Sequence, residues 1–360
     1  MGLFDIFKSK PAQKVVSTNV VDHVKSGEYF RDTSLAEDRN HFIVACNKSA
    51  NGLLPHEILM LAYAHKFKAS NNSFQNFWYS SYGVKDPQAI LQKLVRDNFI
   101  VLGGADTALS GMKVSDLKDL LARHGLSTTG KKEILISRLL ENVSSSILLS
   151  ELPPSNYVLT PKGSSELLQN EYVLYIHNHQ SYEIPMWQMN KWITDNPKQP
   201  WRDHIWAEFN RRCFEYSKRR TGGYYRNNRL NMYSFSSEEG RLNDALSLLA
   251  EVVFLDVAVF GVGAYLAPGN KDSLAQRCKL SPGITKELEK TAFQLSMNSD
   301  ALFKYLHSEF SQLGAFVSMW VNGKMSFSAE DAAGLVVLQL DRNVSGYEAI
   351  CASYEKKLKK

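Results

Sequence analysis

Two stretches decide the fold: VSDLKDLLARHGL at residues 114–126 and GKKEILISRLL at residues 130–140. Apolar residues in each stretch recur at the spacing of a helix that buries one face. They are Val114, Leu117, Leu120 and Leu121 in the first, and Leu135, Ile136, Leu139, Leu140 and, just beyond, Val143 in the second. The pattern predicts two short helices joined by an extended loop.

The turns of this segment carry its candidate chemistry. Gly125 can end the first helix in a left-handed conformation, and Gly130 lets the backbone turn tightly into the second helix. Lys131 and Lys132 then lie at a helix N-terminus, where free backbone N–H groups and the positive end of the dipole already favour an anion. The sequence therefore predicts a phosphate site here.

These residues resemble the SAP domain, a helix, extended loop and helix that binds DNA in many of its members. Two positions depart from the family pattern: Lys113 stands where a Thr or Ser cap is usual, and Ile134 where a polar residue is common. Residues 113–141 have six basic and four acidic side chains, a net charge of only +2. Some SAP domains bind protein instead of DNA or serve only as docking modules. The resemblance implies DNA contacts through Lys113, Lys118, Gly130, Lys131, Lys132 and Arg138.

The flanking residues predict a second domain interrupted by this module. Pro55 and the pair Asp86-Pro87 can start helices, an aromatic piece spans residues 74–82, and a strand is expected at 99–102. A second extended segment at 157–163 leads into another helix. This order resembles a winged-helix domain whose hairpin carries the SAP-like module. A generic helical subdomain with one hairpin is the alternative.

The remaining half, residues 185–360, is expected to be helical. EGRLNDALSLLAEVVFLD at 239–256 resembles one helix–turn–helix of a tetratricopeptide-like repeat, but no regular period repeats it. Amphipathic helices are expected at 284–295, 300–313 and 329–340, before a lysine-rich tail at 355–360. A helical bundle or an irregular helical repeat follows from this pattern.

The densest basic region lies at residues 201–230, with eight Lys or Arg against three carboxylates. Its surplus of +5 equals the net charge of the whole chain, which has 42 Lys and Arg and 37 Asp and Glu. Tyrosines lie among these residues and could stack on bases. The alternative is a helix face paired with nearby carboxylates. The candidate second anion surface comprises Arg211, Arg212, Lys218, Arg219, Arg220, Arg226 and Arg229.

Other chemistry finds little support in the sequence. The triplet His177-Asn178-His179 has the letters of an HNH nuclease but not the later metal-binding histidine, and a surface loop explains it. The four cysteines are far apart, so neither a metal site nor a disulfide framework is indicated. The most apolar run, residues 252–266, is shorter than the roughly 20 residues that span a bilayer. We expect no catalysis, cofactor, metal or membrane partner.

The sequence thus predicts a mainly α protein, and as a whole it resembles SAP-domain proteins of bacteria or phages. It comprises an N-terminal tail (1–30), a discontinuous winged-helix-like α+β domain (31–111 and 144–180), the SAP-like module (112–143) and a C-terminal helical domain (185–360). The expected function is non-enzymatic binding of double-stranded DNA in the cytoplasm, at the nucleoid. The alternative is a protein-interaction scaffold for an acidic protein or peptide, in which the SAP-like module only docks. No oligomeric state is predicted.

Overall fold

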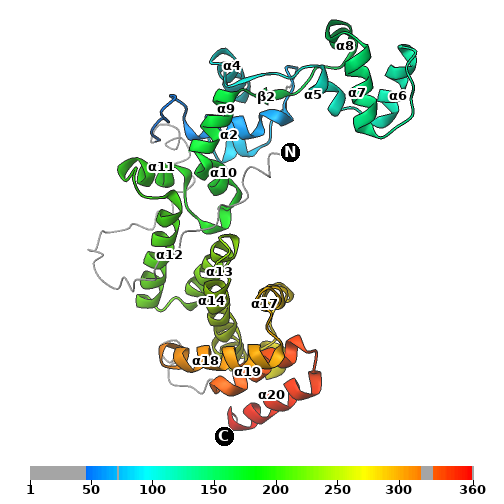
Figure 1. Ribbon diagram of the computed structural model, residues 1–360. Helices are drawn as coiled ribbons and strands as arrows, with labels where there is room; N and C mark the ends of the chain where they lie inside the picture. Colours follow the sequence, from blue (N-terminus) through cyan, green and yellow to red (C-terminus); the bar gives the residue numbers. More distant parts are fainter. Residues whose placement is uncertain (1–45, 71–72, 318–326, 359–360) are drawn as a thin grey trace. The chain divides into compact units, whose positions relative to one another are not determined.

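The computed structural model describes residues 46–70, 73–317 and 327–358 (Figure 1). The tail expected at residues 1–30 lies outside these ranges. The chain divides between His204 and Ile205 into two compact units, which we call the N-terminal and the C-terminal unit. This division lies later than the predicted boundary near residue 185. The reason is that the Asn190 amide bonds to Asn47 and, at 3.0 Å, to the Tyr172 hydroxyl, which fastens its helix to the N-terminal unit.

The N-terminal unit is built around α2 (Pro55–Tyr63). Residues 55–62 are all buried because α4 (Pro87–Arg96), α9 (Pro161–Gln169) and α10 (Glu171–Asn178) pack around this helix. The predicted cap of α4 is confirmed, since the Asp86 carboxylate accepts a hydrogen bond from the Ala89 N–H at 3.0 Å. We call this unit without residues 103–156 its body. The body also contains three short helices, η3 (Ala64–Lys66), α3 (Phe77–Ser80) and η4 (Gln180–Tyr182), and it ends with α11 (Met186–Asp195).

One two-stranded sheet is present in the described ranges, formed by β1 (Ile100–Leu102) and β2 (Tyr157–Leu159). The strands are antiparallel, with Ile100 opposite Leu159 and Leu102 opposite Tyr157. The two extended segments expected from the sequence therefore pair with each other. Helices α2, α3 and α4 precede β1, in the order expected of a winged helix, although membership of that class stays a prediction.

Residues 103–156, between the two strands, fold as four helices (Figure 1). These are α5 (Ala105–Ser110), α6 (Val114–Arg123), α7 (Lys132–Asn142) and α8 (Ser145–Glu151). The structure thus confirms the two predicted helices and adds one on each side. The buried core draws on all four helices: Ala105, Leu109, Leu117, Leu120, Leu121, Leu135, Leu139, Val143 and Leu148.

Two apolar residues expected in this core are exposed instead, Val114 and Leu140. Val114 is the first residue of α6, where the helix has just begun. Leu140 is rotated by about 100° from the buried Leu139, because one residue advances an α-helix by that angle. The apolar stripe is therefore narrower than the sequence pattern predicted.

Every secondary-structure element in the described residues of the C-terminal unit is a helix. The predicted helices at 284–295, 300–313 and 329–340 are confirmed, but residues 355–358 of the expected tail belong to the last helix. A tight turn joins α13 to α14, which pack on each other. The helices are α12 (Trp201–Lys218, which begins in the N-terminal unit), α13 (Gly222–Glu238), α14 (Leu242–Phe254), α15 (Val262–Tyr265), α16 (Leu274–Arg277), α17 (Pro282–Gln294), α18 (Ser299–Val317), α19 (Ala329–Leu340) and α20 (Val344–Leu358).

The core of this unit is α14, continued by the π-helical turn η5 (Leu255–Gly261) and α15. Leu242–Tyr265 is long and apolar enough to cross a membrane, but 83% of its most apolar window is buried inside the protein. Gly261 is needed for packing, because a Cβ there would meet the Cys278 Sγ at 2.7 Å. The run therefore forms a buried core helix, as the sequence predicted.

Candidate nucleic-acid interface

The candidate interface begins at the N-terminus of α6. Lys113 occupies the N-cap position, and its side chain makes no capping hydrogen bond, which fits the missing Ser or Thr noted in the sequence. The first backbone N–H groups of the helix consequently have no side-chain partner there. Lys118 is exposed one turn further along the same helix.

The N-terminus of α7 places a second cationic group next to free backbone donors. Gly130 has a φ of +135°, which favours glycine, and Lys131 is the exposed N-cap of the 11-residue helix. Lys132 is half-buried, and its Nζ donates a hydrogen bond to the Ser110 carbonyl at the end of α5, at 2.7 Å. Lys132 thus holds α7 against α5, whereas Lys131 extends into solvent.

Arg138 has a different position from the one expected of a phosphate contact. Its guanidinium donates hydrogen bonds to the Ser127 carbonyl and, at 3.0 Å, to the Thr129 carbonyl. These two carbonyls belong to the extended loop between α6 and α7. Arg138 therefore braces the loop that leads to Gly130, and it positions the lysines rather than standing free beside them.

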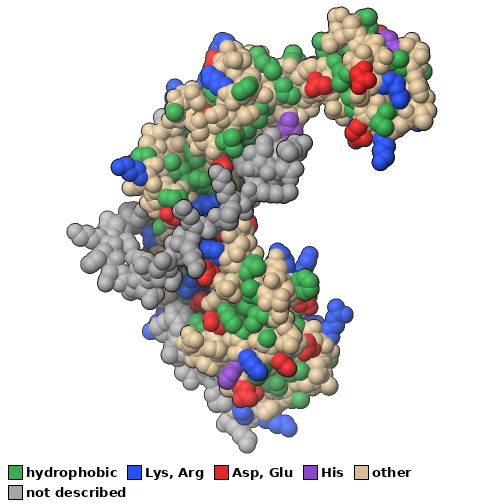
Figure 2. Space-filling model, in the orientation of Figure 1, with side chains coloured by type: hydrophobic (Ala, Val, Ile, Leu, Met, Phe, Trp, Pro, Cys, Tyr) green, Lys and Arg blue, Asp and Glu red, His purple; other side chains and the backbone are tan. Residues whose placement is uncertain are grey.

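Charges of both signs are interspersed on the surface of α5 to α8 (Figure 2). Within the part of the chain that the structure describes, no carboxylate forms an ion pair with Lys113, Lys118, Lys131 or Lys132. By contrast, Arg123 at the end of α6 lies 3.3 Å from Glu151. The site thus depends on a few unpaired lysines at helix ends rather than on a large excess of positive charge.

Comparison with known proteins agrees with this geometry. The family model of the SAP domain matches residues 108–144, from the end of α5 to the residue before α8. No curated protein and no solved structure matches the chain. The fold and the site therefore define a mainly helical protein with a SAP domain inserted between two paired strands, and that domain suggests DNA binding in general.

The basic region at 201–230 looks different in the structure from the surface that the sequence suggested. Arg211 and Arg212 both bind Glu208, one helical turn earlier, at 2.8 and 2.7 Å. The side chain of Glu208 is only 5% exposed. Burial by itself raises the pKa of Glu208, but the two guanidinium groups outweigh it and hold this pKa below its ordinary value. Much of the charge of this arginine pair is therefore compensated locally.

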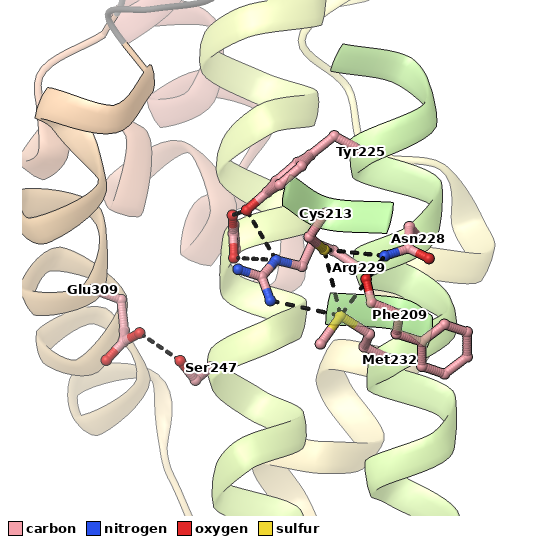
Figure 3. Close-up of polar contacts among 9 residues, drawn as sticks. Phe209, Cys213, Tyr225, Asn228, Arg229, Met232, Ser247 and Glu309 are labelled. Carbon is pink, nitrogen blue, oxygen red and sulfur yellow. Dashed lines mark hydrogen bonds and ion pairs between the residues drawn. The ribbon is translucent and has the colours of Figure 1, made fainter. Parts of the chain in front are cut away.

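Arg226 and Arg229 point into the C-terminal unit. Arg226 forms two hydrogen bonds with Asp256, at 2.8 and 2.6 Å. Arg229 lies 2.9 Å from Glu251, which also accepts a hydrogen bond from the Tyr225 hydroxyl (Figure 3). Burial by itself lowers the pKa of Arg229, but Glu251, Cys213 and Tyr225 together outweigh it and raise this pKa. Both arginines join α13 to α14 and η5, so they hold the core together.

The remaining cations of the predicted anion surface lie at the end of α12. Arg219 forms a weak pair with Glu215 at 3.6 Å. Lys218 and Arg220 are exposed and have no ion pair with any described residue, and Arg220 has a left-handed φ of +53° at the helix end. The predicted seven-residue anion surface thus reduces to the turn between α12 and α13.

His177 does not lie in a surface loop, as the sequence suggested, but on a buried face of α10. Its Nε2 is 3.0 Å from the Tyr63 hydroxyl, and its Nδ1 is 2.7 Å from the Tyr82 hydroxyl. Burial lowers the pKa of His177, and Lys66 lowers it further. The sequence missed this arrangement because the two tyrosines lie about a hundred residues away along the chain.

Proposed function

We propose that the protein is a non-enzymatic DNA-binding protein that holds duplex DNA through largely sequence-independent phosphate contacts of its SAP domain. One observation carries the proposal: Lys131 is exposed and unpaired at the N-cap of α7, beside the free N–H groups of the first turn. Both groups favour a phosphate at the same place. Lys113, at the N-cap of α6, offers a similar combination.

The other residues of the site would act around this pair of helix ends. Lys118 adds an exposed positive charge on α6. Lys132 adds a positive charge at the start of α7 while its Nζ donates a hydrogen bond to the Ser110 carbonyl. Gly130 and Arg138 shape the loop. A winged-helix-like body would carry the domain, and the DNA partner would place the protein in the cytoplasm, at the nucleoid.

The test compares two double variants of the full chain on a labelled duplex at several salt concentrations. Lys131→Ala/Lys132→Ala removes the proposed contacts. The control Lys286→Ala/Lys290→Ala removes two exposed lysines from α17. Each phosphate contact steepens the slope of log K against log salt by about 0.9, so we expect the first variant to be shallower by about 1.8. At 0.1 M salt the same relation corresponds to roughly sixty-fold weaker binding.

The control should bind like the wild type, since its lysines lie outside the site. Equal affinity and equal slope for both double variants would show that the α7 N-terminus does not hold the phosphates. Circular dichroism of both variants checks that the helices are intact.

A specific observation favours the scaffold as a second candidate function. At the α12–α13 turn, Phe214 is 65% exposed and Tyr224 is 53% exposed, with Tyr224 stacked on Tyr216 at 5.6 Å. Lys218 and Arg220 lie at the same helix end. Aromatic side chains beside cations suit an acidic peptide with apolar residues.

The scaffold is tested with the full chain and Phe214→Ala as baits in a nuclease-treated extract. A protein retained by the wild type and lost with Phe214→Ala would support it. If no protein depends on Phe214, the turn does not dock a partner.

A further inference from the structure

A hollow of about 360 Å³ lies where the SAP domain joins the body of the N-terminal unit. Thr107, Gly111 and Met112 line it from α5 and the residues that follow. His65 and Lys68 line it from the body, and residues 153–158, which lead into β2, close it. It is thus bordered on one side by the SAP domain and on the other by the domain that carries it.

Short, bonded connections define the shape of this junction. Only Gly103 and Gly104 separate β1 from α5, and a Cβ at Gly103 would meet the Thr107 Cβ at 2.5 Å. The Gly103 N–H donates to the Asn156 carbonyl at 2.9 Å. Asn156 in turn forms a bridge to Lys68 and donates from its side chain to the His65 carbonyl at 2.6 Å. The hollow is therefore held by hydrogen bonds on both sides.

The lining of the hollow suits an anion. It includes Lys68, His65 and the Thr107 hydroxyl, and none of its lining residues is Asp or Glu. Burial and Lys66 lower the pKa of His65, which favours its neutral form near neutral pH. Lys68 therefore supplies the positive charge of the lining. An anion there would meet the Lys68 cation, whereas the Thr107 hydroxyl already donates to the adjacent Asp106 carboxylate at 3.5 Å.

The hollow also adjoins residues of the proposed DNA site along the chain. Its lining residues Gly111 and Met112 lie directly between Ser110, which binds Lys132, and Lys113, the N-cap of α6. Residues 110–113 thus connect three lysines: Lys132 bonds to Ser110, Lys113 follows Met112, and Lys68 lines the hollow together with Gly111 and Met112. Single DNA-binding modules typically bury about 600–1,000 Å² of protein surface, which favours contacts beyond two short helices.

We propose that the backbone of DNA held at the α7 N-terminus continues across this hollow, where the ammonium group of Lys68 neutralises a further phosphate. The body that carries the SAP domain is then part of the DNA-binding surface. This inference rests on the proposed function, and it adds Lys68, which lies outside the SAP domain, to the DNA-binding surface.

The experiment measures duplex affinity against salt for the full chain and for Lys68→Ala. One lost phosphate contact should make the slope shallower by about 0.9 and weaken binding roughly eightfold at 0.1 M salt. Lys68→Arg, which keeps the charge, should retain the wild-type slope. The control is Lys191→Ala on α11, an exposed lysine paired with Asp195 at 2.7 Å, far from α5 to α8 in Figure 1.

The outcomes separate this inference from the proposed function. If the wild type binds DNA and Lys131→Ala/Lys132→Ala weakens it while Lys68→Ala behaves like Lys191→Ala, the inference is overturned and the proposed function stands. If the wild type shows no salt-dependent binding to duplex DNA, the proposed function fails and the inference falls with it.

Discussion

The lysines of the SAP domain and the arginines of residues 201–230 have opposite surroundings. Lys131 is exposed at a helix N-terminus without a carboxylate partner among the described residues. Arg226 and Arg229 bind Asp256 and Glu251, which lie in a neighbouring helical segment. The second region has the larger surplus of charge in the sequence, yet most of its arginines are engaged within the protein.

This difference shows that charge density along a chain is a poor guide to a polyanion site. What matters is whether a carboxylate of the same fold already compensates the charge. A few unpaired lysines at helix ends remain available to a phosphate, whereas a guanidinium group buried beside a carboxylate would have to break that pair first. The comparison can be tested by removing charges from each region.

The largest effect is expected for Arg229→Ala. It leaves Glu251 buried without its cationic partner, and breaking a buried pair in this way typically costs about 3–5 kcal/mol of unfolding free energy. Chemical denaturation, with hydrogen exchange of α13 and α14 to locate the change, measures it. DNA affinity should stay unchanged while the protein is folded. A loss of stability below about 1 kcal/mol would contradict the core role of Arg229.

An intermediate effect is expected on acidification, through Glu208. Its pKa in the folded protein lies below the ordinary value of 4.5, since Arg211 and Arg212 outweigh its burial. A carboxyl group with a lowered folded-state pKa stabilises the fold fully above its unfolded pKa and loses this contribution as the pH falls through the folded value. The wild type should therefore lose more stability between pH 6 and pH 3 (roughly the range over which carboxylates titrate) than Glu208→Gln does.

Unfolding free energies of both proteins across that pH range test this expectation. Parallel curves for the wild type and Glu208→Gln would mean that the two arginines do not stabilise the ionised carboxylate. That result would contradict the conclusion that Glu208 compensates the charge of Arg211 and Arg212.

The smallest effect is expected for Arg219→Ala. Its pair with Glu215 is long, at 3.6 Å, and the arginine side chain is 58% exposed. Exposed pairs of this kind contribute about 0.5 kcal/mol or less. Thermal denaturation should show almost no change, in contrast to Arg229→Ala. A loss comparable to that of Arg229→Ala would show that exposure does not separate the two kinds of arginine.

Sequence reasoning was most successful where the signal was local. The leucine spacing of α6 and α7, the turn at Gly130 and the cap at Asp86 each involve residues within a few positions of one another. The pairing of Glu208 with Arg211 and Arg212 is also local, at spacings of three and four residues, so it could be predicted from the sequence.

Other features could not be predicted because their partners are backbone carbonyls or lie in distant parts of the chain. Arg138 reaches carbonyls of the preceding loop, and backbone carbonyls leave no trace in a sequence pattern. His177 is buried between Tyr63 and Tyr82 from other helices. The hollow beside Lys68 exists only because two strands bring both ends of the SAP domain back to the body.

The sequence by itself therefore determined the SAP helices, their loop and the position of the Gly-Lys-Lys turn, because helix periodicity and turn chemistry act over a few residues. The tertiary structure alone decided that Arg226 and Arg229 are neutralised inside the C-terminal unit while Lys131 stays exposed. The physical reason is that an ion pair depends on distance in space, and the carboxylates concerned, Asp256 and Glu251, lie 22 or more residues further along the chain.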